Sequence, residues 1–150
     1  MGVAGLSPEQ VVQFQSDGFL VLEDFASSDE VKAMLTRADE LVESFDPSTV
    51  PNSVFSTTDQ KKTSDQYFLD SGNHVSFFFE EKAFDEDTGE LRQAKGLSIN
   101  KMGHAMHDLD PTFRAFSRSP KVAALLGSLG MKTPTPVSYT HLTLPTIHLV

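Results

Sequence analysis

The chain has 150 residues, 39% of them apolar and 22% charged, as is typical of one globular domain. A net charge of −9 argues against nucleic-acid binding, which needs clustered Lys and Arg, and the lack of cysteine excludes disulfides, Cys-ligated zinc and iron–sulfur clusters. No apolar run is long enough to span a bilayer, and no signal pattern opens the chain, so the expected localisation is cytoplasmic.

The first elements in chain order are two helices joined by a strand. Ser7 and Gln10 can form a capping box around Pro8, and Gly18 suits the left-handed end of that helix. Residues 19–22, Phe-Leu-Val-Leu, are apolar throughout and predict a short buried strand.

The second helix is predicted to begin after Ser27 or Ser28. Asp29 and Glu30 would lie in its first turn, where acidic side chains favour the helix dipole. Its apolar residues recur at steps of three and four and form one stripe: Val31, Met34, Leu35, Ala38, Leu41, Val42 and Phe45. Packing against a core explains such a stripe without any cofactor.

The middle of the chain contains the strand candidates. A polar loop is expected over 46–62, followed by strands at 67–69 and 75–79 that flank a turn at 71–73. Residues 85–89 form a plausible hairpin tip, and 97–100 can be a further strand. Two short helices should then start at Asp110-Pro111 and Ser119-Pro120, each a cap followed by a first-turn proline.

His104, His107 and Asp108 are the most obvious metal-ligand candidates. A spacing of three residues could bring both imidazoles to one ion, but the acidic neighbour and four-residue spacing of the familiar helical zinc motif are absent. None of the five histidines has an acidic residue two positions later, as a His-x-Asp iron site requires. The pattern therefore favours structural histidines at the surface or boundary, and no metal ligand is assigned.

Lys101 is the candidate binding residue. It follows the possible strand 97–100 and precedes Gly103, so its ammonium group could project from a strand end and hold a carboxylate. From spacing alone, a solvated lysine is the favoured interpretation.

Several stretches taken together resemble the phytanoyl-CoA dioxygenase family. They are Leu6-Ser7-Pro8, Asp17 to Glu23, Phe77 to Glu80, Phe84-Asp85, Ser98-Ile99-Asn100-Lys101, Gly103-His104-Ala105 with His107, and Asp110-Pro111. The resemblance implies an α+β fold: N-terminal helices and the first strands of a double-stranded β-helix (a cupin-like jelly roll), with the barrel incomplete. It also implies an Fe(II)- and 2-oxoglutarate-dependent dioxygenase acting on a small-molecule substrate, with Lys101 contacting 2-oxoglutarate.

The last residues call for a separate hypothesis. Residues 137–146 resemble translated adapter sequence from sequencing libraries, so we expect residues 1–136 to be the N-terminal part of the dioxygenase domain and 137–150 to be a non-native tail. The family's iron ligands would then lie beyond this chain, which would bind neither cofactor well and be inactive. Two alternatives stay open: a non-enzymatic helical binding module that docks through the 31–45 stripe, and a small hydrolase with metal at His104 and His107.

Overall fold

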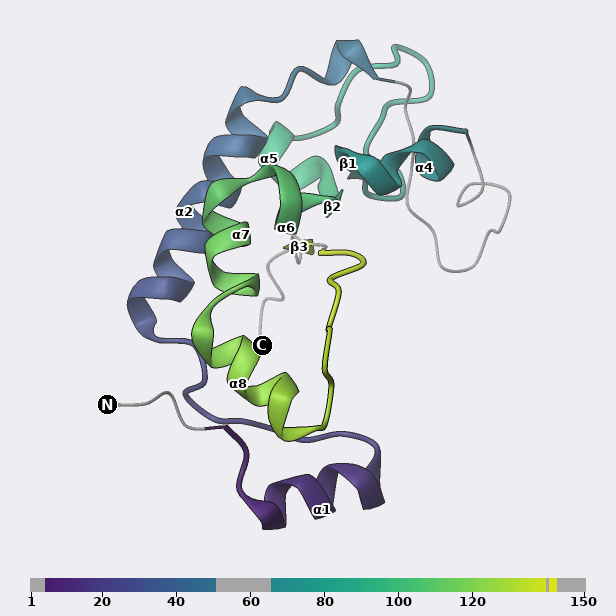
Figure 1. Cartoon of the computed structure of the whole chain (residues 1–150). Coiled ribbons are helices and arrows are strands. Elements are labelled where there is room, and N and C mark those ends of the chain that lie inside the picture. Colours follow the sequence, from purple (N-terminus) through teal and green to yellow (C-terminus); the bar gives the residue numbers. More distant parts are fainter. Residues whose placement is uncertain (1–4, 51–65, 140, 143–150) are drawn as a thin grey trace, which may run out of the picture.

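The computed structural model describes residues 5–50, 66–139 and 141–142. A long helix, α2 (Ser28–Ser44), runs along one side of the molecule, and a small sheet with α4 (Gln66–Asp70) lies at one end (Figure 1). At the opposite end α1 (Pro8–Asp17) lies beneath α8 (Pro120–Ser128). Helices α5 (Lys95–Ser98) and α7 (Pro111–Ser117) pack against α2.

Helix α1 has the predicted ends. The Ser7 side chain accepts from the Gln10 amide while the Gln10 side chain accepts from the Ser7 amide, so two otherwise unpaired donors are satisfied. Gly18 takes a left-handed conformation with φ of 79°, which a residue with a Cβ adopts only at a cost. Both boundaries are therefore dictated by local sequence.

The prediction of a strand at 19–22 is wrong. The segment forms no strand in the described structure, and its side chains alternate between two environments. Phe19 and Val21 are 64% and 72% exposed, whereas Leu20 and Leu22 are half-buried against Phe14 and α8. An apolar run cannot reveal by itself that only one of its faces is covered.

Helix α2 confirms the stripe prediction in part. Ser27 caps it with a second capping box, completed by Glu30. Ala38 and Val42 are buried, and Met34, Leu41 and Phe45 pack on the core, but Val31 and Leu35 at the other end are largely exposed. The stripe meets the core along its C-terminal half.

The sheet is built from β1 (Val75–Phe79), β2 (Ile99–His104) and β3 (His141–Leu142), in that order. β1 and β2 are antiparallel, with Phe77 opposite Met102 and Phe78 opposite Lys101. The predicted strand at 75–79 is confirmed, whereas that at 97–100 begins only at Ile99, because Leu97 and Ser98 end α5.

Residues 67–69 are helical, not extended as predicted, since they lie within α4. A 3-10 helix, η2 (Ser71–Asn73), follows directly and makes the expected turn into β1. A similar short helix, η1 (Pro47–Thr49), opens the predicted loop at 46–62, most of which lies outside the described residues. The hairpin tip at 85–89 is confirmed by the bridge between Phe84 and Leu91.

Short helices follow the sheet, and their starts match the sequence. α6 (Met106–Leu109) leads into α7, where Asp110 accepts from the amides of Thr112 and Phe113. Asp110 also accepts from Arg37 of α2 at 2.7 Å, so one buried carboxylate both caps α7 and ties it to α2. Ser119 caps α8 in the same manner.

The core lies between the sheet and the α2–α7 pair. It contains Ala38, Val42, Phe77, Phe79, Ala83, Ile99, Met102, Met106 and Phe113. Phe45 stacks on Phe77 with ring centroids 4.1 Å apart, which anchors the end of α2 to β1. The prediction of mixed helices and strands is confirmed, while a double-stranded β-helix stays a prediction. No described helix is long and apolar enough to cross a membrane.

Candidate binding site

Lys101 lies in the middle of β2, not at a strand end, and is buried, with only 6% of its surface exposed. Its Nζ atom is 5.0 Å from the ring centroid of Phe68 and 5.1 Å from that of Phe78. Phe78 stands opposite Lys101 in the sheet, and Phe68 comes from α4 above it. The ammonium group therefore lies between two aromatic faces, which attract a cation.

Burial lowers the pKa of Lys101 below its ordinary value, since a charged amine is poorly solvated there. The two rings offset part of that cost because their π faces are negative. A buried ammonium of this kind attracts an anion more strongly than a solvated lysine does, because little water competes for it. The interpretation of Lys101 as a solvated surface lysine is therefore wrong.

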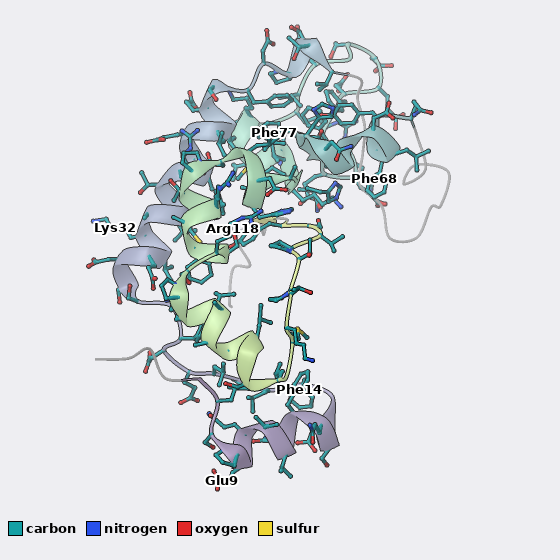
Figure 2. The ribbon with its side chains drawn as sticks, in the orientation of Figure 1. Glu9, Phe14, Lys32, Phe68, Phe77 and Arg118 are labelled. Carbon is teal, nitrogen blue, oxygen red and sulfur yellow. The ribbon has the colours of Figure 1, made fainter. Side chains whose placement is uncertain are left out.

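His104 contacts the same two aromatic rings as Lys101, those of Phe68 and Phe78. Its imidazole centroid is 5.5 Å from Phe68 and 5.8 Å from Phe78, in tilted or edge-on arrangements. Its Nδ1 atom is 2.8 Å from the Ser71 hydroxyl oxygen, and burial followed by the charge of Lys101 lowers its pKa. Lys101 and His104 thus contact the same pair of rings, those of Phe68 and Phe78. Figure 2 shows Phe68 at the α4 end of the molecule.

His107 does not join His104. It lies on α6, is 3% exposed, and has its Nε2 atom 3.3 Å from the Asp108 carboxylate. Its Nδ1 atom is buried with no hydrogen-bond partner among the described residues. The prediction of a surface or boundary position holds for half-buried His104 and is wrong for His107, which the packing of α6 against α7 encloses.

The described residues do not fit a metal centre. Across residues 5–50, 66–139 and 141–142, no group of three or more His, Cys, Asp or Glu side chains could hold an ion. Asp108, the third residue of the candidate cluster, pairs instead with Arg118.

Sequence reasoning missed the residues that surround Lys101. Phe68 was placed in a strand, and Ser71 was treated only as part of a turn. One available signal was the run of three Phe at 77–79, since alternation along a strand must direct the middle ring away from its neighbours. Phe78 is that middle residue, fully buried yet outside the core that contains Phe77 and Phe79.

A surface groove lies elsewhere on the molecule. It has a volume of about 440 Å³ and is lined by α7, α8 and residues 131–136, with Val122, Leu126 and Met131 on its walls. Lys101 is not among its lining residues. Its apolar walls carry one guanidinium, that of Arg118, which Asp108 already neutralises.

Comparison with known proteins decides the family. A family model described as phytanoyl-CoA dioxygenase (PhyH) matches residues 14–146. The chain belongs to this family. It is 51% identical over 135 residues to a phytanoyl-CoA dioxygenase of Arabidopsis thaliana, covering 89% of this chain and 47% of the relative. It is 46% identical over 139 residues to the bovine (Bos taurus) phytanoyl-CoA dioxygenase domain-containing protein 1, covering 90% of this chain and 47% of the relative.

The chain therefore spans about half the length of the curated relatives it matches. The matched range extends past Pro136 into the segment that resembles adapter sequence. In the structure, Tyr139 of this segment donates its amide to the His104 carbonyl, and β3 pairs with β2. A non-native origin of residues 137–150 stays a prediction.

Proposed function

We propose that this chain forms part of an Fe(II)- and 2-oxoglutarate-dependent dioxygenase, and that Lys101 binds a carboxylate of 2-oxoglutarate. The observation that carries the proposal is a buried ammonium group on a strand of a phytanoyl-CoA dioxygenase family member. Membership of the family supports the dioxygenase assignment.

The surroundings of Lys101 suit a small anionic co-substrate. The ammonium group is cationic when protonated, and the rings of Phe68 and Phe78 limit the access of water that would weaken an ion pair. In enzymes of this kind 2-oxoglutarate is the co-substrate whose oxidative decarboxylation drives hydroxylation. Lys101 contributes binding and orientation of the carboxylate, and takes no part in bond making.

Iron has no ligand set among the described residues, so we assign no step of the reaction to a metal held by them. In the proposed enzyme the iron ligands and the pocket for the small-molecule substrate lie outside these residues. We accordingly propose that this chain alone binds Fe(II) weakly and turns over no 2-oxoglutarate.

Binding of 2-oxoglutarate tests the role of Lys101. Titration calorimetry of the 150-residue chain at high ligand concentration should show weak binding of 2-oxoglutarate, because the chain lacks the rest of the enzyme. Lys101→Met should weaken this binding further by about tenfold or more, the usual loss for a charge-assisted hydrogen bond. Lys32→Met is the matched control, because Lys32 is an exposed lysine on the outer side of α2 (Figure 2). Equal affinity of the Lys101→Met variant and the wild type, or no binding by either, would contradict the proposal.

The two alternative functions lack comparable support. A docking module would need the 31–45 stripe at the surface. Most residues of the stripe instead pack in or against the core, and of the stripe only Val31 and Leu35 are largely exposed. A hydrolase with metal at His104 and His107 would need the two rings at one site, whereas His104 bonds to Ser71 and His107 lies beside Asp108.

A further inference from the structure

A second ionisable group, His104, lies near Lys101 and is not used by the proposed function. His104 and Lys101 contact the same two aromatic rings, those of Phe68 and Phe78. One of these groups is a permanent cation at neutral pH, and the other can gain a proton near neutrality. Their shared surroundings make them parts of one binding site.

The hydrogen bonds of Ser71 assign the tautomer of His104. The Ser71 hydroxyl donates its only hydrogen to the Phe68 carbonyl at 2.6 Å, so toward the imidazole, 2.8 Å away, its oxygen must accept. We therefore assign the ring hydrogen to Nδ1. In the neutral ring the basic lone pair is then on Nε2, and that atom is the one that can take up a proton.

Two effects hold the ring neutral when no anion is nearby. Burial is the larger one, and the positive charge of Lys101 is the second; both lower the pKa of His104. The titratable groups on the elements packed around this ring, among described side chains, are Lys101 on β2, Tyr67 and Asp70 on α4, and His74 before β1. Of these, Lys101 is the one whose charge acts on the pKa of His104.

We propose that His104 is a second anion-binding residue of the Lys101 site, and that its Nε2 atom takes up a proton from solvent when a dicarboxylate binds. This inference rests on the proposed 2-oxoglutarate site. A carboxylate beside Lys101 cancels the repulsion that opposes an imidazolium, so the bound state favours the charged ring. Ser71 keeps the ring in place in both states, because Nδ1–H is a donor in each.

The sign of the pH dependence follows by linkage. A bound anion raises the pKa of His104, so the complex binds more protons than the free protein, and affinity for 2-oxoglutarate increases as pH falls. The carboxyl groups of the ligand ionise near pH 4 and stay charged throughout the useful range. Between about pH 8 and about pH 5.5 the dissociation constant should fall roughly threefold to tenfold, as expected for one nearby opposite charge.

Titration calorimetry can count the protons taken up on binding. The binding enthalpy is measured in two buffers of different ionisation enthalpy, neither of them phosphate, and the difference between the two enthalpies gives the number of protons. Wild-type protein should take up a substantial part of about one proton per 2-oxoglutarate bound at a pH near 6.5. His104→Asn retains a donor toward Ser71 but has no basic nitrogen, and should abolish the uptake. His74→Asn is the matched control, since His74 is exposed, and should leave the uptake unchanged.

A measurement on the unsubstituted chain guards against a misfolded variant. The His104 ring protons, followed by NMR against pH, should titrate at a higher pH with saturating 2-oxoglutarate than without it. Binding with no proton uptake and an unmoved His104 titration would overturn this inference and leave the Lys101 site standing. If the wild-type chain binds no 2-oxoglutarate at any pH, the proposed function fails and this inference fails with it.

Discussion

The two faces of the β1–β2 ladder have opposite chemistry. One face presents Phe77, Phe79 and Met102 to α2 and α7, where apolar side chains fill the space. The other presents Phe78 and Lys101 to α4, where an ammonium and an imidazole are buried among rings. Side-chain alternation separates Phe78 from Phe77 and Phe79, and Lys101 from Met102, so the same two strands provide a stabilising face and the proposed binding face.

Burial has a different energetic consequence on each face. Removing apolar surface from water on the α2 side stabilises the fold, by about 25 cal/mol for each Å². Burying the Lys101 charge on the α4 side costs free energy that the ring contacts offset only in part. A face retained at such a cost is expected to serve binding.

The largest expected effect comes from removing an aromatic ring on the apolar face. Phe113→Ala should lower the free energy of unfolding by about 3–5 kcal/mol, because it leaves a cavity at a fully buried position. Leu109→Ala is the control, since Leu109 lies one turn earlier and is largely exposed. Urea denaturation of both variants measures the difference, and equal losses would show that α7 does not anchor the core.

A smaller loss of stability is expected on removing the buried carboxylate of Asp110, which joins α2 to α7. Asp110→Ala removes both the cap of α7 and the bond from Arg37, and should cost about 3 kcal/mol. Asp110→Asn can still cap the helix and should recover roughly 1 kcal/mol of this loss. Thermal or urea unfolding of the pair separates capping from the ion pair, and identical stabilities would mean that the cap contributes nothing.

The smallest effect has the opposite sign and lies on the binding face. Lys101→Met should leave stability at pH 7 unchanged or raise it by about 1 kcal/mol, because an apolar side chain of similar length replaces a buried charge. The same variant is the one expected to weaken 2-oxoglutarate binding. A clear loss of stability of the Lys101→Met variant in urea would show that Lys101 stabilises the fold.

The pH dependence of stability sharpens that comparison. The folded pKa of Lys101 is below the ordinary lysine value of 10.5, so the unfolded state binds more protons between the two values. Wild-type stability should therefore rise with pH in this window relative to Lys101→Met. Parallel stability curves for the two proteins would contradict a lowered pKa.

Local signals in the sequence predicted the helix ends well. The starts of α1, α2, α7 and α8 follow from Ser or Asp caps, and Gly18 ends α1, because these effects involve residues only a few positions apart. The secondary structure of short apolar runs was predicted less well. Residues 19–22 and 67–69 were both expected to be strands, and neither is, since such runs are too short to show a period.

The candidate site was predicted only as a single residue. Lys101 was identified through the family resemblance, while spacing alone could not separate it from a solvated lysine. The residues around Lys101 are separated from it by 33 positions (Phe68), 30 positions (Ser71) and 3 positions (His104). Contacts between residues 30 or more positions apart leave no recognisable pattern in a single sequence. His104 and His107 are close in the chain, but they lie on different elements, which their spacing in the sequence does not reveal.

The sequence by itself determined the caps, the apolar stripe of α2 and the family, because each depends on neighbouring residues or on an ordered set of motifs. Only the tertiary structure decided which face of each element is covered. It placed α4 over Lys101, directed Phe78 away from Phe77 and Phe79, and left Phe19 and Val21 exposed. The physical reason is that burial depends on contacts between distant segments, and the proposed binding role of Lys101 rests on its burial.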